Sequence, residues 1–185
     1  DIDYLKTIGY KDDFLSYLKN LKFTGNIRSM QEGELCFGNE PLIRVEAPLI
    51  QAQLIETILL NIINFHTLIA TKASRIRQIA MNDTLMEFGT RRGQEIDAGL
   101  WGARAAFIGG FDSTSNVRAG KLFDIPVSGT HAHALVQTYG EEYTAFKKYA
   151  ERHKNCVFLV DTFHTLKSGV PTACLLYTSL MARGR

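Results

Sequence analysis

The residues best suited to chemistry lie in the segment 125–133, whose sequence is IPVSGTHAH. Its apolar start runs into small polar residues and two histidines, namely Ser128, Gly129, Thr130, His131 and His133. In α/β folds, ligands bind beyond the carboxyl ends of strands, where loop N–H groups and side chains converge. Neutral imidazole can act as a base, an acid or a phosphoryl acceptor near pH 7. Hydroxyl and backbone donors beside His133 favour phosphate chemistry, although a histidine at a helix start can also simply bond a backbone carbonyl.

Two further predicted strand ends carry side chains suited to anions or sugars. Arg91 and Arg92 offer fork-shaped donors to a phosphate or a carboxylate. Adjacent arginines before a helix can equally be solvated, so their spacing leaves both interpretations open. Asp161 stands where its carboxylate could hold ribose hydroxyls, and Thr165 opens the next helix near any phosphate. The alternative role for Asp161 is to cap that helix.

The segment 112–116, with the sequence DSTSN, is rich in side chains that cap helices. Asp, Ser, Thr and Asn accept hydrogen bonds from the free N–H groups of a first helical turn. The segment therefore predicts an N-cap for a helix that begins at Val117. Because a helix N-terminus also attracts anions, capping and anion binding can coexist there.

A metal site is the main alternative for the two histidines. On a strand, His131 and His133 would point to the same face and could chelate a metal, as in metal-dependent barrel hydrolases. Glu87, Asp161 and His164 could be recruited to complete such a site. No other strand end carries a convincing set of ligands, and ligand number is as diagnostic as ligand type. The residue pattern therefore disfavours a metal centre.

Alternating short apolar runs and helical patterns describe the elements that would position these residues. The pattern predicts helices at 11–20, 48–60, 66–80, 95–108 and 139–153, and strands at 34–37, 42–46, 85–88, 126–128 and 156–160. The turn residues of segment 38–41 predict a hairpin between the first two strands. From residue 84 onward, strands alternate with helices, which predicts an α/β fold with a parallel sheet or a barrel.

Composition sets broad limits on the function. The chain has 185 residues, 45% of them hydrophobic, which fits one globular domain or a piece of a larger one. Its 21 basic and 19 acidic residues are interspersed, so no nucleic-acid footprint is visible. Three cysteines without a close pair indicate a reducing compartment, and with no secretory signal we expect a cytoplasmic protein. Polar residues interrupt the apolar stretch 49–70, which predicts a core helix and no membrane span.

Four motifs in order resemble nicotinate phosphoribosyltransferase. They are EFGTRR at 87–92, GGFDSTSN at 109–116, SGTHAH at 128–133 and VDTFHTLKSG at 160–169. The resemblance extends upstream through NEPLIRVE at 39–46 and LNIINF at 60–65, and covers about residues 23 to 171.

The resemblance implies synthesis of nicotinate mononucleotide and pyrophosphate from nicotinate and phosphoribosyl pyrophosphate, coupled to ATP hydrolysis, in NAD salvage. It implies Mg²⁺ with ATP and phosphoribosyl pyrophosphate, no tightly bound cofactor, and a homodimer of the full-length protein. Displacement of pyrophosphate passes through an oxocarbenium-like ribose, so cations that stabilise the leaving group and good positioning suit the reaction. The motif wording favours nicotinate over nicotinamide.

The resemblance also assigns roles to individual residues. His133 matches the family's phosphorylated histidine, and Thr130 beside Ser128 and Gly129 matches a nicotinate-contacting threonine. The remaining matches are Arg91 and Arg92 at the family's anion-binding strand end, and Asp161 and Thr165 near the ribose and phosphate. The resemblance assigns no metal-binding role to His131.

The expected fold is α/β, a partial irregular α/β barrel preceded by the end of an N-terminal α/β domain. We expect residues 1–47 to be the remainder of that N-terminal domain and 48–171 the first part of the barrel with its preceding helices. Residues 172–185 do not resemble the family and look like read-through of a cloning adapter. Family segments before Asp1 and after Pro171 are expected to be missing, so the chain alone should be inactive. A non-catalytic interaction domain is a third function class beside the transferase and the hydrolase.

Overall fold

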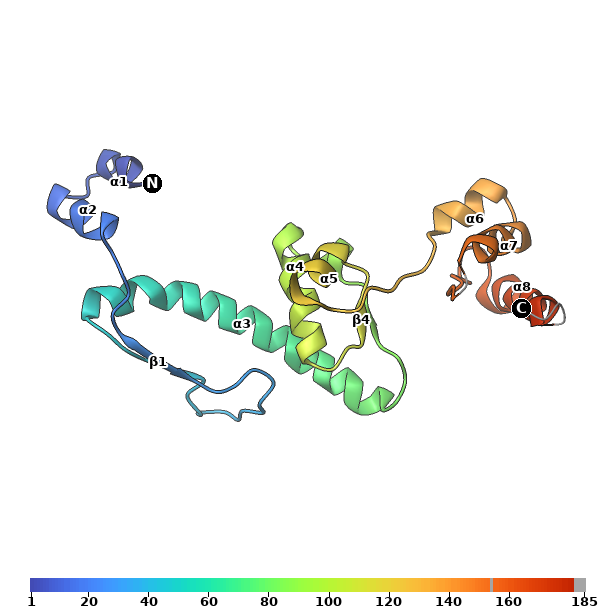
Figure 1. Cartoon of the computed structure of the whole chain (residues 1–185), viewed down its shortest axis with the longest axis horizontal. Coiled ribbons are helices and arrows are strands. Elements are labelled where there is room, and N and C mark those ends of the chain that lie inside the picture. Colours follow the sequence, from blue (N-terminus) through green and yellow to red (C-terminus); the bar gives the residue numbers. More distant parts are fainter. Residues whose placement is uncertain (154, 182–185) are drawn as a thin grey trace.

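The computed structural model describes residues 1–153 and 155–181, and the side chains of these residues up to 179. The elements follow one another along an extended molecule (Figure 1). A long helix occupies the first half, a compact group of short strands and helices lies near the middle, and further helices gather at the C-terminal end. The central group, residues 85–128, is called the strand region below, and residues 130–181 are called the histidine region.

The N-terminal part consists of two short helices and a two-stranded antiparallel sheet. Helices α1 (Ile2–Thr7) and α2 (Asp12–Lys19) precede strands β1 (Asn26–Ser29) and β2 (Ile43–Glu46). Ile27 pairs with Val45 in this sheet. The predicted helix at 11–20 and the predicted strand at 42–46 are confirmed.

The predicted hairpin between 34–37 and 42–46 is wrong, because β2 pairs with β1 and residues 34–37 form no strand. Two glutamates explain the difference. The Glu34 carboxylate accepts a hydrogen bond from the N–H of Gln31, and the Glu40 carboxylate accepts one from the N–H of Phe37. Such local side-chain bonds to the backbone stabilise turns and compete with sheet pairing.

Helix α3 (Leu49–Ala80) is one continuous helix, where the sequence pattern predicted two. No glycine or proline interrupts residues 61–65, and the asparagines there lower helix propensity by only a few tenths of a kcal/mol, roughly. Only Gln51 and Ala73 of α3 are buried, so the expectation of a core helix is not met within this chain. By length and composition alone α3 is apolar enough to cross a membrane, a test that core helices of soluble proteins also pass.

The strand region has the parallel topology that the sequence predicted. Strands β3 (Met86–Glu87) and β4 (Ser113–Thr114) pair in parallel, and Val127 continues the order through a parallel bridge to Thr114. The 3-10 helix η1 (Thr90–Arg92) and helix α4 (Glu95–Ile108) connect β3 to β4. Helix α5 (Val117–Phe123) connects β4 to the bridge. This βαβαβ order makes the chain α/β, although the described residues contain only two-stranded sheets and no closed barrel.

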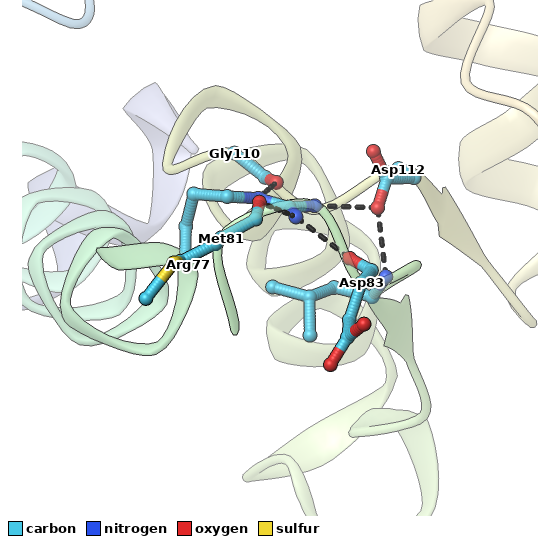
Figure 2. Close-up of polar contacts among 6 residues, drawn as sticks. Arg77, Met81, Asp83, Gly110 and Asp112 are labelled. Atoms are coloured by element: carbon cyan, nitrogen blue, oxygen red, sulfur yellow. Dashed lines mark hydrogen bonds and ion pairs between the residues drawn. The ribbon is translucent and has the colours of Figure 1, made fainter. Parts of the chain in front are cut away.

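Close backbone packing and a partly buried arginine hold α3 against the strand region. A Cβ atom at Gly109 would lie 2.5 Å from the Ala70 carbonyl oxygen, so only glycine permits this approach of α4 to α3. Figure 2 shows Arg77 of α3 donating to the carbonyls of Gly110, Met81 and Asp83 and to the carboxylate of Asp112. These bonds fasten the end of α3 to the start of the parallel strands.

The Asp112 carboxylate contributes a second bond at the same junction. Besides the Arg77 guanidinium, it accepts a hydrogen bond from the N–H of Leu85 at 2.7 Å. The Leu85 bond and then the Arg77 bond lower the pKa of the Asp112 carboxyl below its ordinary value. The carboxylate is therefore the form that the folded junction stabilises.

The histidine region is built from helices. Helices α6 (His133–Tyr139) and α7 (Glu142–Arg152) replace the single helix predicted at 139–153, because Gly140 takes a left-handed conformation with φ of 74° and ends α6. The π-helix η2 (Thr165–Gly169) runs directly into α8 (Val170–Met181). A buried cluster joins the helices, formed by Val136, Ala145, Phe146 and Leu176.

The strand predicted at 156–160 is not formed, because these residues have no strand partner among the described residues. The segment instead packs against the helices around it. Phe158 and Val160 contact the buried cluster, and the close approach of Gly169 to the Val160 carbonyl leaves no room for a Cβ atom. The described part of segment 172–185, which we expected not to resemble the family, contributes Leu176 to the same cluster.

Candidate active site

His133 is the first residue of α6, and two side chains from one other segment face its ring. Its Nδ1 atom lies 3.2 Å from the Thr162 hydroxyl, and its Nε2 atom lies 3.8 Å from the Asp161 carboxylate. The His133 side chain is 44% exposed and that of Asp161 57% exposed. The structure thus brings a reachable imidazole, a carboxylate and a hydroxyl together at one place on the surface.

The end of segment 156–160 positions Asp161 and Thr162. After this segment the chain bends into η2, whose N-cap is His164 and not Asp161. The His164 Nδ1 atom accepts a hydrogen bond from the N–H of Lys167 at 3.2 Å. Because His164 performs the capping, the Asp161 carboxylate stays available to a ligand, and Thr165 lies exposed in the first turn of η2.

The small polar residues before His133 connect the strand region to the histidine region. The N–H of Ser128 donates to the Thr114 carbonyl at 3.0 Å, which ties Ser128 to the parallel strands. Gly129 is exposed with open space around its Cα atom. The Thr130 hydroxyl donates to the His131 carbonyl at 2.9 Å. These residues form an extended connection between the two regions (Figure 1).

Arg91 and Arg92 lie in η1 on the strand region, and both are exposed. Neither side chain makes an ion pair or hydrogen bond within the described residues. Both arginines follow the end of β3, as the sequence predicted, and their guanidinium groups are available to bind an anion. The described contacts do not join them to His133, which lies on the other region (Figure 1).

A buried polar network lies at the strand ends. The sequence did not predict this network, because Glu87 was considered only as a metal ligand. The Glu87 carboxylate is 9% exposed and accepts bonds from the Thr114 hydroxyl, at 2.7 Å, and from the N–H of Gly89. The Thr114 hydroxyl also accepts the N–H of Asn116 at 3.0 Å. Asn116 caps α5 through the N–H of Ala119 and donates to Thr90. The predicted N-cap is therefore confirmed, and it forms part of a network that fixes the carboxyl ends of β3 and β4.

The metal alternative does not fit the geometry of His131. Its ring is buried, and both ring nitrogens face backbone groups, Ala132 and Leu159. No group of three or more His, Cys, Asp or Glu side chains that could hold a metal ion occurs among the described residues. Burial raises the pKa of the nearby Cys156 thiol, so this cysteine is not an activated nucleophile.

One groove lies far from His133 in sequence, between β2 and α3. Its volume is about 480 Å³, and its lining is mostly apolar. Ile43 and Val45 line one side, and Ile55 and Leu59 line the other. The lining of this groove does not include His133 or Asp161, whose side chains are 44% and 57% exposed to solvent.

Comparisons with known proteins relate this geometry to a family. A model of the nicotinate phosphoribosyltransferase N-terminal domain matches residues 1–64 and ends inside α3. Nicotinate phosphoribosyltransferase of Bacillus subtilis is 67% identical over 174 residues, which is 94% of this chain. The chain belongs to the nicotinate phosphoribosyltransferase family. Nicotinate phosphoribosyltransferase pncB2 of Mycobacterium tuberculosis is 38% identical over 90% of the chain. The chain spans 36% of the length of each of these two relatives.

Solved structures agree with the assignment to the nicotinate phosphoribosyltransferase family. The chain is similar to the crystal structure of human nicotinic acid phosphoribosyltransferase, with a TM-score of 0.80 and 30% identity over 93% of this chain and 45% of that one. It is also similar to nicotinate-nucleotide pyrophosphorylase from Pyrococcus furiosus, with a TM-score of 0.69 and 32% identity over 76% of this chain and 37% of that one.

Proposed function

We propose that the protein to which this chain belongs is an ATP-coupled nicotinate phosphoribosyltransferase. It forms nicotinate mononucleotide and pyrophosphate from nicotinate and phosphoribosyl pyrophosphate, and so supplies NAD synthesis. The observation that carries the proposal is the grouping of His133 with Asp161 and Thr162, in a chain whose relatives bear the name of this activity. An imidazole held between a carboxylate and a hydroxyl suits a phosphoryl acceptor.

The surroundings of His133 support different roles for its two ring nitrogens, with the proton on Nε2 and the attacking lone pair on Nδ1. The Asp161 carboxylate, 3.8 Å from Nε2, favours the tautomer that carries its proton on Nε2. Nδ1 then holds the lone pair, toward which the Thr162 hydroxyl points at 3.2 Å. In the proposed step this lone pair attacks the γ-phosphorus of ATP, the bond to the bridging oxygen breaks, and ADP leaves. The carboxylate stabilises the positive charge that develops on the ring.

Hydrolysis of the phosphohistidine completes the coupling. Water attacks the phosphorus, the P–N bond breaks, inorganic phosphate leaves, and the nitrogen regains its lone pair. A phosphoryl group on His133 replaces the Thr162 hydroxyl at Nδ1 and adds negative charge beside Asp161. Because both changes occur at the surface that binds substrates, they alter its affinity and link ATP hydrolysis to the transfer.

The other residues of the proposed site bind the substrates. Thr130, with Ser128 and Gly129, contacts nicotinate, and the exposed Gly129 backbone allows close approach. Arg91 and Arg92 bind an anionic group, since they extend from the strand end without protein partners among the described residues. Thr165 lies near the phosphate. Arg91 and Arg92 belong to the strand region and Thr165 to the histidine region, so in the proposed complete site the substrates span both regions.

Mg²⁺ is proposed to accompany ATP and phosphoribosyl pyrophosphate, and the side chains present fit it. Such sites commonly use one or two carboxylates together with substrate phosphates. Asp161 offers a solvent-accessible carboxylate for this ion, and the side-chain group that lies near it in the described chain is the His133 imidazole at 3.8 Å. When bound, the ion neutralises phosphate charge and stabilises the pyrophosphate leaving group.

The architecture of the whole protein forms part of the same proposal. Residues 48–171 supply the first part of an irregular α/β barrel, residues 1–47 belong to the end of an N-terminal domain, and the native protein is a cytoplasmic homodimer. The parallel order of β3, β4 and Val127 supports the start of such a barrel. Residues 172–185 are proposed to be foreign to the family.

Product formation tests the proposed function. The whole protein is incubated with nicotinate, phosphoribosyl pyrophosphate and Mg²⁺, with and without ATP, and nicotinate mononucleotide is quantified; nicotinamide replaces nicotinate in a parallel assay. We expect product from nicotinate, stimulated by ATP, and loss of that stimulation in His133→Ala. The control His153→Ala changes an exposed histidine outside the group and should behave as the unaltered protein. Absence of product would contradict the proposal.

A further inference from the structure

His131 takes no part in the proposed reaction, and its surroundings differ from those of His133. The residue is 6% exposed, whereas the side chain of His133 is 44% exposed. The centroids of three aromatic rings lie 5.0 to 6.4 Å from the centroid of its imidazole, those of Phe146, Tyr149 and Phe158. A histidine placed two residues before a reactive one and packed in this way has a role other than contact with substrate.

Hydrogen bonding fixes the protonation state of the His131 ring. The N–H of Leu159 donates to Nε2 at 3.0 Å, so Nε2 must carry a lone pair. The single ring proton then sits on Nδ1, which faces the Ala132 carbonyl at 3.2 Å. A doubly protonated ring would turn an N–H toward the N–H of Leu159 and would place a charge in a buried position. The geometry therefore requires the neutral Nδ1–H tautomer.

The bond between His131 and Leu159 sets a register between two segments. His133 lies two residues after His131, and Asp161 lies two residues after Leu159. The two pairs, His131 with Leu159 and His133 with Asp161, therefore share one offset. Residues 156–160 have no sheet pairing in the described chain that could set this offset instead. A slip of one residue would move Asp161 by about 3.3 Å along the chain and separate it from His133.

We propose that His131 is a positioning residue that sets the register between segments 130–133 and 157–162, and so holds His133 between Asp161 and Thr162. The acceptor at Nε2 supplies the registering bond, and the aromatic rings around His131 hold the imidazole in place. This inference rests on the proposed function where it concerns catalysis, and on geometry alone where it concerns the register.

Two substitutions separate the acceptor from the bulk of the ring. In His131→Gln, the side-chain carbonyl oxygen can take the place of Nε2 and accept from Leu159. In His131→Leu, an apolar side chain fills the site without an acceptor. His153→Leu is the matched control, because the His153 ring also lies against the Tyr149 ring, with centroids 4.4 Å apart, but His153 is exposed and outside the register. Circular dichroism establishes that each variant is folded before it is assayed.

Two readouts are measured on the whole protein. Hydrogen exchange of the Leu159 amide reports the register without reference to activity. The initial rate of phosphate transfer from γ-labelled ATP to His133 reports its catalytic consequence. For His131→Leu we expect at least about tenfold faster exchange at Leu159 and at least about tenfold slower labelling, the scale of one lost buried hydrogen bond. For His131→Gln and His153→Leu we expect both values within about threefold of the unaltered protein.

Each other outcome decides against the inference or against the proposed function alone. Unchanged exchange and labelling in His131→Leu would overturn the positioning role, as would equal losses in the Leu and Gln variants. If the unaltered protein accepts no phosphate, the proposed function fails. In that case, faster Leu159 exchange in His131→Leu than in His131→Gln would still support the register. Equal exchange in the two variants would overturn the register as well.

Discussion

In both the strand region and the histidine region, candidate site residues lie at the ends of chain segments, but different interactions hold those ends in place. In the strand region, β3, β4 and Val127 pair through backbone hydrogen bonds, and the Glu87 carboxylate ties two strand ends together from inside. In the histidine region, the segment carrying Asp161 has no described strand partner and relies on His131 and on packing against helices. Backbone pairing fixes the first region, whereas side chains fix the second.

This difference matters for the proposed reaction. Arg91 and Arg92 extend from a paired strand end, so their backbone is positioned before any ligand arrives. His133, Asp161 and Thr162 depend on contacts that a single substitution can remove. The proposed phosphoryl acceptor, His133, therefore lies in the part of the chain that is more easily disturbed. Substitutions in the two regions can break this contrast, with expected effects that range from large to small.

Removal of the central side chain of the histidine region should have the largest effect. Phe146 is fully buried among Val136, Ala145 and Leu176, so Phe146→Ala should lower the free energy of unfolding of this region by about 3–5 kcal/mol. Hydrogen exchange of the α7 amides in chain 1–185 measures the loss. The single tryptophan, Trp101 of α4, reports the strand region separately by fluorescence, and its transition should stay within about 0.5 kcal/mol.

The control for this prediction is Phe163→Ala, because Phe163 is 56% exposed in the same region. It should change the free energy of unfolding by no more than about 0.5 kcal/mol. If Phe146→Ala instead shifts the Trp101 transition as much as the α7 exchange, the two regions unfold as one unit and the contrast between them is wrong.

Loss of one hydroxyl should weaken the strand region by an intermediate amount. In Thr114→Val, the Glu87 carboxylate keeps its burial but loses the donor at 2.7 Å, which should cost about 1–3 kcal/mol. Denaturant unfolding followed by Trp101 fluorescence measures the change. Thr114→Ser retains the hydroxyl and should recover most of the loss. Equal destabilisation by both variants would show that packing, and not the carboxylate bond, matters at this position.

The smallest effect concerns pH and the junction with α3. Bonds from Leu85 and Arg77 lower the pKa of Asp112, so its contribution to stability is complete above the ordinary carboxyl pKa and is lost as the pH falls through the lowered value. Asp112→Asn should therefore flatten the acid limb of the stability profile while leaving its shape near neutrality unchanged. Unfolding transitions measured across the acidic range test this, and an unchanged acid limb would contradict it.

The sequence predicted those elements whose signals are local. Helix α4 was expected at 95–108 and has those limits, and Asn116 caps α5 as its side chain suggested. The expected strand at 156–160 failed because an apolar run becomes a strand only when a partner strand lies beside it. The hairpin predicted from the turn residues of segment 38–41 failed because Glu34 and Glu40 accept local backbone hydrogen bonds that stabilise turns in place of a strand at 34–37.

The candidate site was predicted only in part for a similar reason. The motif around His133 identified the residue, but nothing in its spacing indicated that Thr162 would face its ring. Nor did the spacing show that His131 would bond the backbone of Leu159, 28 positions along the chain. A carboxylate within an apolar strand and a threonine at the end of the next strand were the available signals for the Glu87 network. Contacts between distant residues depend on packing, which local patterns do not encode.

Phosphate transfer to His133 tests the central claim most directly. The whole protein is incubated with γ-labelled ATP and Mg²⁺ and kept alkaline, because phosphohistidine is labile to acid. Trypsin then releases the peptide between Lys121 and Lys147, which contains both His131 and His133. Fragmentation of this peptide should place the phosphate on His133, and His133→Asn should abolish it while His153→Asn does not. Turnover without phosphate on this peptide, or phosphate on His131, would contradict the account.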